Sequence, residues 1–321
     1  MTERPAFTLS SGDLIADRRF AWAKDCEAKG DLAGAADLFR QTADLAPGYA
    51  PAWFGLGEVC EKLGRSEEAI DAYRKSLAAD PQDRHGAGLR LARADGGETD
   101  MSRGYVESLF DGFAPTFDRA LTKDLAYRGP EMLRTGLLRA CESLGREPRF
   151  ARALDLGCGS GLAGITLRPL AAWLEGVDLS AGMLREARKK AVYDRLEGGD
   201  MLGFLGDARV RSAAYDLIVA ADVFVYVRKL DDVLAASARV LAAGGLFAFT
   251  TETHDGTGTI LRETLRFAHS SDAVKAGLEA AGLTSLVLEP AAVRNEKRQP
   301  VPGLLVVAAH DAASVARGGV S

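Results

Sequence analysis

Cysteine and histidine are scarce in this 321-residue chain, which contains four of each. The cysteines are scattered without a Cys-x-x-Cys pair and the histidines lack ligand spacing, so we expect a reducing compartment and no bound metal. No apolar run is long enough to span a bilayer, and the first 14 residues lack the basic and then apolar order of a signal peptide. These absences predict a cytoplasmic protein without a membrane partner.

An excess of charge of one sign is also missing. The net charge is −5 and charged residues make up 26% of the chain, so no overall basic field favours binding to nucleic acid. Hydrophobic residues make up 47% of the chain, which at this length is enough to bury a large core and predicts two domains.

A glycine-rich stretch at residues 153–161 is the most informative part of the chain. The apolar run that ends at Leu156 indicates a buried strand, and residues 162–168 indicate a short helix that Pro169 stops. Strand, glycine turn and helix together are typical of a nucleotide-binding crossover. In such a crossover the N–H groups at the turn favour a carboxylate or a phosphate.

Two acidic residues follow the next predicted strands. Asp178 ends a second apolar run, 17 residues after Gly161, where a carboxylate can accept two hydrogen bonds from a ribose diol. Asp200 follows a glycine turn 22 residues later, where a carboxylate can accept from an adenine amino group. The fingerprint of nicotinamide dehydrogenases would need glycine at position 162, and this chain has Leu162.

This combination resembles the class I S-adenosylmethionine-dependent methyltransferases over roughly residues 129–310. The resemblance implies an α/β, Rossmann-like core of seven strands with a closing antiparallel hairpin, and S-adenosyl-L-methionine as the cofactor. For Leu179 and Met183, a place in the hydrophobic core is the alternative to cofactor contact. For Asp155 the alternative is a brace under the turn, and Cys158 is expected to fill space without acting as a nucleophile. The implied cofactor-binding residues are Asp155, Gly157, Cys158, Gly159, Gly161, Asp178, Leu179, Met183, Gly199, Asp200, Met201 and Ala220.

Residues 16–83 contain an internal repeat with a period of 34 residues, in which Gly30 matches Gly64 and Phe39 matches Tyr73. The period and the residue types resemble the tetratricopeptide repeat, in which each copy is a helical hairpin. Two copies and a capping helix form a small all-α domain, so we expect it to dock on the core, on a second copy or on a protein partner. Residues 16–83 carry a net charge of 9 − 13 = −4, which favours a basic partner.

An aromatic segment connects the repeats to the core. Residues 105–118 hold four aromatic side chains, which form either a lid over the cofactor or a helix pair that covers the sheet. This architecture resembles bacterial predicted methyltransferases that carry such repeats. The predicted order is an N-terminal extension (1–15), the repeat domain (16–94), a linker (95–104), the aromatic lead-in (105–150), the methyltransferase core (151–310) and a tail (311–321).

Nucleic-acid bases are disfavoured as the methyl acceptor. The fourth predicted strand, residues 215–220, ends in Ala-Ala-Asp at residues 220–222. The Asn/Asp-Pro-Pro-aromatic motif of enzymes that methylate exocyclic DNA amino groups is therefore missing there, and the Pro-Cys nucleophile needed for C5 methylation of cytosine is also absent. Strand ends hold the ligands in open α/β sheets, and histidine can act as a general base near neutral pH. For a loop histidine, a solvated side chain is the alternative. The candidate catalytic residues are Tyr226, Glu252, His254 and His269.

The sequence thus predicts a methyltransferase that acts on oxygen or nitrogen of a small molecule by in-line transfer, without a metal or a covalent intermediate. Two alternatives remain open. One is a protein methyltransferase whose substrate the repeats deliver, and the other is an interaction scaffold that binds cofactor without catalysis. Arg266 and Arg294, in later connections, are candidates to meet an acidic substrate.

Overall fold

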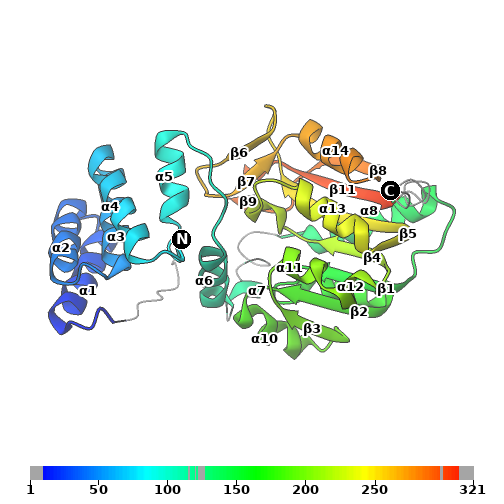
Figure 1. The fold of residues 1–321 in the computed structure, drawn as a ribbon, viewed down its shortest axis with the longest axis horizontal. Coiled ribbons are helices and arrows are strands. Elements are labelled where there is room, and N and C mark those ends of the chain that lie inside the picture. Colours follow the sequence, from blue (N-terminus) through cyan, green and yellow to red (C-terminus); the bar gives the residue numbers. More distant parts are fainter. Residues whose placement is uncertain (1–9, 115, 120, 122–126, 297–298, 311–321) are drawn as a thin grey trace. The chain divides into compact units, whose positions relative to one another are not determined.

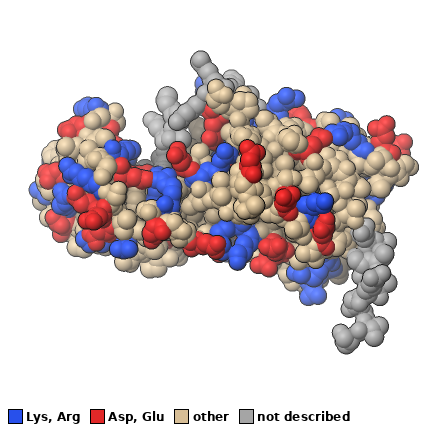
Figure 2. Space-filling model, turned by 90° about the horizontal axis from the view of Figure 1, so that it is seen from above, with Lys and Arg blue, Asp and Glu red and all other residues tan. Residues whose placement is uncertain are grey.

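The computed structural model describes residues 10–114, 116–119, 121, 127–296 and 299–310. The chain divides into two compact units, Met1–Gly112 and Phe113–Ser321 (Figure 1). Figure 2 shows basic and acidic side chains interspersed over one face, in keeping with the small net charge. None of the helices in the described ranges is long and apolar enough to cross a membrane.

The first unit is all helical. Glycine lets its helices approach closely, because a Cβ on Gly55 would lie 2.7 Å from the Phe39 ring and one on Gly57 would lie 2.5 Å from the Tyr73 ring. The matched aromatics Phe39 and Tyr73 are therefore both buried against the same helix, α3. The helices are α1 (Leu14–Ala28), α2 (Leu32–Leu45), α3 (Ala50–Lys62), α4 (Ser66–Ala79), α5 (Ala87–Asp95) and α6 (Arg103–Phe113).

Within the described residues, the second unit is built on a nine-stranded sheet whose main path has the order β3-β2-β1-β4-β5-β11-β8. Along this path the strands β3, β2, β1, β4 and β5 are parallel to one another, and β11 runs antiparallel to both of its neighbours. The strand order reverses between β1 and β4, which is where open parallel sheets bind ligands. The path comprises β1 (Phe150–Leu156), β2 (Ala171–Asp178), β3 (Arg195–Gly198), β4 (Tyr215–Ala220), β5 (Leu241–Glu252), β8 (Leu283–Ala291) and β11 (Gly303–His310).

Helices cover both faces of this sheet (Figure 1). Side chains alternate along each strand, so Leu154 and Ile218 lie in one core and Ala153 and Leu217 lie in the other. This arrangement confirms the predicted fold class. The first core is covered by α11 (Met201–Gly206), α13 (Asp231–Val240) and α14 (Ser271–Ala280), and the second by α8 (Gly129–Ser143) and α9 (Leu162–Leu167).

Some elements differ from what the sequence predicts. Ala-Gly-Gly at residues 243–245 predicts a turn before a fifth strand from Leu246 to Thr251, but β5 begins at Leu241, because residues 243–245 lie within the strand where its pairing with β4 shifts register. Four short strands are not predicted, since two or three residues carry little periodic signal. They are β6 (Thr259–Leu261), β7 (Phe267–His269), β9 (Asn295–Glu296) and β10 (Gln299–Pro300).

The aromatic lead-in is divided between the two units. Tyr105 is buried in the first unit, where a Cβ on Gly86 would lie 2.8 Å from its ring. Asp118, in α7 (Phe117–Arg119), accepts a hydrogen bond from Ser160 in the second unit. Residues 115, 120 and 122–126 of this predicted segment lie outside the described residues, and the lid stays a prediction.

Candidate active site

The glycine loop joins β1 to α9 at the carboxyl edge of the sheet. Gly157, Gly159 and Gly161 have φ angles of +67°, +53° and +91°, in the left-handed region that favours glycine. A Cβ on Gly157 would also lie 2.6 Å from Val223, which follows β4. No described atom lies within 4 Å of the place where a Cβ on Gly159 would sit, so a ligand can approach this part of the loop.

Tyr193, which precedes β3, packs beneath the glycine loop. A Cβ on Gly161 or on Gly176 would lie 3.0 Å from its ring, and one on Gly164 would overlap it. Small residues from three elements thus make room for one aromatic side chain. Tyr193 could not be identified from the sequence, because small residues indicate a bulky neighbour without showing which residue it is.

Asp155, at the end of β1, is wholly buried. Its Oδ2 accepts a hydrogen bond from the Tyr193 hydroxyl at 2.7 Å, while Oδ1 has no partner among the described residues. Burial raises the pKa of Asp155 to about 7; the bond from Tyr193 opposes this rise and the nearby Asp178 carboxylate adds to it. Asp155 therefore braces the loop through one oxygen, while its other oxygen has unused capacity to accept a hydrogen bond within the described residues.

Replacing Asp155 by asparagine should remove a pH dependence of folding stability. An acid whose pKa is raised in the folded state holds an extra proton there, so its contribution to stability falls as pH rises from 3.8 to about 7. Between about pH 5 and about pH 8, urea unfolding should show Asp155→Asn gaining roughly 1–3 kcal/mol relative to the wild type. Parallel pH profiles of the two proteins would contradict this assignment.

Asp178 ties the glycine loop to the neighbouring strand. The Gly159 N–H donates to its Oδ2 at 2.8 Å and the Ser180 N–H donates to its Oδ1 at 2.8 Å. The Gly199 N–H donates to the Asp178 carbonyl at 3.0 Å, so the ends of three strands are linked. Each carboxylate oxygen can accept more than one hydrogen bond, as the ribose diol predicted here would require.

The other predicted cofactor residues differ in exposure. Asp200 is exposed and caps α11, accepting from the Gly203 N–H at 2.8 Å. Met183 is wholly buried in α10 (Ala181–Lys190), which favours a core position. Burial raises the pKa of the Cys158 thiol well above its usual range, as expected of a residue that only fills space. The remaining members are half-buried Leu179, Gly199 and Met201 and buried Ala220.

A polar cluster that the sequence does not reveal joins the loop to α7 and α10. The Lys190 ammonium lies 2.6 Å from the Asp118 carboxylate and donates to the Ser160 carbonyl at 2.6 Å. The Ser160 hydroxyl donates to the same carboxylate. These contacts hold the outer part of the glycine loop in place.

A second cluster, here called the arginine cluster, lies beyond the carboxyl ends of β4, β5 and β8, and Arg294 is its centre. The Arg294 side chain is 1% exposed, and its Nη1 donates to both oxygens of Asp222 at 3.0 and 3.1 Å. Its Nη2 donates to Glu252 and, at 3.1 Å, to Glu296. One guanidinium therefore holds three carboxylates from three separate connections.

Glu252, a predicted catalytic residue, is committed to this cluster. Arg262 donates to it at 3.0 Å, and an Arg266 nitrogen lies 3.6 Å from it. Burial alone would raise the pKa of Glu252, but Arg294 and Arg266 outweigh burial and lower it below its ordinary value. Glu252 is therefore a stable anion, which makes it a poor proton acceptor.

The two predicted histidines are engaged in local contacts. His269 is 2% exposed; its Nδ1 lies 2.9 Å from the Thr251 hydroxyl and its Nε2 lies 2.9 Å from the Val227 carbonyl. Burial lowers the pKa of His269, so the ring is neutral and joins β7 to the connection after β4. Both nitrogens of His254 contact backbone groups of its own loop at 3.1 Å. The catalytic roles of both histidines remain predictions.

Two tyrosines lie near the same edge. The Arg266 guanidinium lies 5.7 Å from the ring centre of Tyr226, within the range of a cation–π contact. Burial, then the charges of Asp222 and Asp155, raise the pKa of Tyr127 well above its usual range. No motif in the sequence points to Tyr127.

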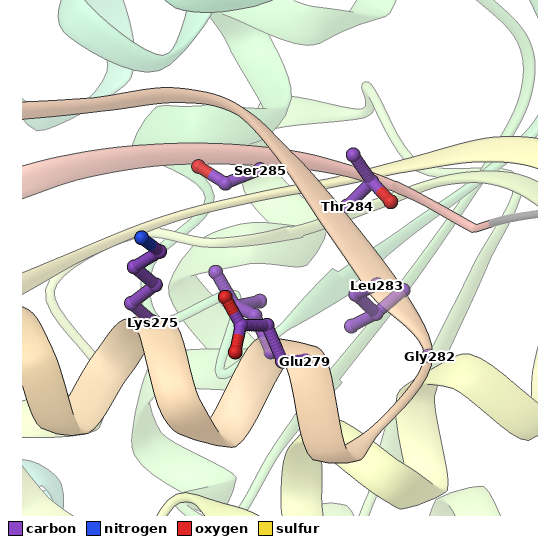
Figure 3. A pocket seen from close by; sticks show the side chains of 7 residues that line it. Lys275, Glu279, Gly282, Leu283, Thr284 and Ser285 are labelled. Carbon is purple, nitrogen blue, oxygen red and sulfur yellow. The ribbon is translucent and has the colours of Figure 1, made fainter.

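A separate hollow of about 380 Å³ lies between α14 and β8 (Figure 3). Lys275 and Glu279 line it from the helix, and Leu283 to Ser285 line it from the start of the strand. Both β8 and β5 run antiparallel to β11, so the start of β8 lies at the amino edge of the sheet. The hollow is therefore remote from the glycine loop, which lies at the carboxyl edge.

Comparison with known protein families gives two matches. A methyltransferase domain family matches residues 154–247, and a tetratricopeptide repeat family matches residues 20–84. The first match contains the glycine loop, Asp178 and Asp200, and the second begins within α1 and covers the rest of both helical hairpins. The chain carries a class I methyltransferase domain preceded by tetratricopeptide repeats. The first match confirms that this domain is of the methyltransferase type predicted from the sequence.

Two curated relatives support the domain assignment. Malonyl-(acyl-carrier protein) O-methyltransferase of Geobacter sulfurreducens is 34% identical over 44% of this chain and 58% of its own length. Ubiquinone biosynthesis O-methyltransferase of Burkholderia cenocepacia is 33% identical over 31% of this chain and 44% of its own length. The chain thus spans only about half the length of each relative.

Among solved structures, the (4+2)-cyclase SpnF is similar, with a TM-score of 0.50 and 16% identity over 66% of this chain and 97% of that chain. This similarity shows the fold alone. A cyclase with this fold also means that the fold by itself does not establish the reaction.

Proposed function

We propose that the chain is a methyltransferase that transfers a methyl group from S-adenosylmethionine to an oxygen of a small acidic molecule. The cofactor supplies a methyl group that is already activated on a sulfonium. The residues of the chain hold the acceptor in line with that methyl group and exclude water. The position of Arg266 in the arginine cluster is the observation that supports an acidic acceptor.

The carboxyl edge of β1, β2 and β3 suits this cofactor. Asp155 has a buried oxygen without a partner among the described residues, and an amino acid ammonium can donate to it. Asp178 would accept from the ribose hydroxyls, and Asp200 would accept from the adenine amino group. The backbone at Gly159 is open to the ligand. These roles follow from the chemistry of the donors and acceptors at the edge.

A methyl acceptor that is already ionised is compatible with the residues of the arginine cluster. Glu252 has a lowered pKa and His269 is buried with both nitrogens in contact, so neither is suited to remove a proton. A carboxylate oxygen needs no proton removal before it attacks. Arg266 Nη1 is buried without a hydrogen bond within the described residues, 3.6 Å from Glu252 and 3.8 Å from Glu296. The side chain as a whole is 23% exposed, and the exposed part of the guanidinium is the proposed donor to a carboxylate. The two curated relatives, both O-methyltransferases, point to the same acceptor atom.

A matched acceptor panel tests this proposal. Purified protein with S-adenosylmethionine is offered carboxylic acids, phenols and amines of similar size, and release of S-adenosylhomocysteine is measured. The proposal expects turnover with acids above the rate without acceptor. Turnover with amines and none with acids would contradict it.

Replacing Arg266 by methionine should lower kcat/KM for an acidic acceptor by roughly 30- to 150-fold, because a charge-assisted hydrogen bond of about 2–3 kcal/mol is lost. The affinity for S-adenosylmethionine should stay the same, since Arg266 belongs to the arginine cluster and not to the proposed cofactor-binding residues. Arg211→Met, at an exposed position of α12 (Ala208–Arg211), is the control. An Arg266→Met enzyme with unchanged kcat/KM would rule out this role.

A further inference from the structure

The first helix exposes a face of large apolar side chains. In α1, Leu14, Ile15 and Trp22 are 87%, 60% and 53% exposed. Ile15, Arg18, Trp22 and Asp25 follow one another at intervals of three and four residues, so they share one face of the helix. Clustered apolar exposure of this kind marks a surface that is covered by something.

The internal repeat shows what covers the equivalent face in the second copy. The residues 34 positions after this face are Tyr49, Ala52, Leu56 and Val59, which are 7%, 0%, 5% and 0% exposed. The preceding hairpin buries them; the Phe20 ring of α1, for example, lies 5.3 Å from the Tyr49 ring. The face of α1 is therefore the place where another helical element packs in this fold.

The charges on this face indicate which helix fits. Arg18 and Asp25 stand where the second copy has Ala52 and Val59, and they lie at equal distances along the helix from a centre between Ala21 and Trp22. When two α1 helices cross antiparallel about that centre, each Arg18 faces Asp25 of the other copy, and each Trp22 faces Ala21. We propose that this face binds a second copy of the chain by a two-fold, antiparallel contact of α1.

The contact is small, so the dimer should be weak. One pair of helices buries less than the standard area of a stable interface, which suggests a dissociation constant on the order of 10–100 μM. The other occupants of the face would be the second unit of the same chain or a different protein. In either case the full chain alone would sediment as a monomer.

Reversing the two charges separately gives a specific test by sedimentation equilibrium of the full chain, from about 5 μM to about 1 mM. Arg18→Asp and Asp25→Arg should each weaken self-association at least about tenfold, because like charges then meet twice across the axis. An equal mixture of the two variants should restore it, because both pairs are again of opposite charge. Trp22→Ala should also weaken it at least about tenfold.

Arg74→Asp is the matched control, because it makes the same charge change at an exposed position of α4 and should leave association unchanged. Circular dichroism of each variant separates loss of association from loss of folding. A wild-type chain that stays monomeric up to about 1 mM would overturn the proposal. So would a dimer that neither charge reversal weakens, or a mixture of variants that associates no better than either one alone.

Discussion

Replacing Asp178 by alanine should weaken the binding of S-adenosylmethionine by about 2–3 kcal/mol, which is roughly a 30- to 150-fold higher dissociation constant. The change removes the acceptor for the ribose hydroxyls. It also releases the Gly159 and Ser180 N–H groups, which donate to Asp178 at 2.8 Å, and so loosens the glycine loop. Isothermal titration calorimetry of both proteins measures the difference directly.

The control for this measurement is Glu279→Ala, which removes an exposed carboxylate from α14 beside the remote hollow (Figure 3). Its affinity for S-adenosylmethionine should equal that of the wild type. If a folded Asp178→Ala protein bound the cofactor as tightly as the wild type does, the ribose assignment would be wrong.

Replacing Arg294 by methionine should lower the free energy of unfolding by about 3–5 kcal/mol, because removing one partner of a buried ion pair leaves the other charges without compensation. Arg294 is 1% exposed and holds Asp222, Glu252 and Glu296 together, so three carboxylates would repel one another in its absence. Urea unfolding near neutral pH measures the loss, with exposed Arg239→Met as the control.

Lowering the pH should reduce the difference in unfolding free energy between the wild type and Arg294→Met. The pKa of Glu252 is lowered in the folded protein, so its ion pairs stabilise the fold above the ordinary carboxyl pKa and lose that effect as pH falls through the folded value. The gap between the wild type and Arg294→Met should therefore narrow at low pH. A variant within about 1 kcal/mol of the wild type near neutral pH would contradict the central role of Arg294.

Local motifs account for what the sequence could predict about the site. The glycine loop, Asp178 and Asp200 follow three successive strands, and parallel strands bring their carboxyl ends to one edge of the sheet. Their spacing along the chain is therefore enough to place them together. The helical hairpins were predictable for a similar reason, because the 34-residue period repeats the same packing positions.

The contacts that the sequence does not reveal join residues far apart in the chain. Tyr193 bonds to Asp155, and Arg294 bonds to Asp222 and Glu252 across 72 and 42 positions. No periodic pattern encodes such pairs. Side-chain chemistry alone pointed to Glu252, whereas its three arginine neighbours make it a stable anion with a lowered pKa.

The most direct test of the methyltransferase assignment is isothermal titration calorimetry of the intact protein with S-adenosylmethionine, S-adenosylhomocysteine and NAD in parallel. We expect the first two to bind with dissociation constants on the order of micromolar and NAD not to bind. Binding of NAD alone would mean that the glycine loop, Asp178 and Asp200 serve a different cofactor, and the proposed reaction would have to be abandoned.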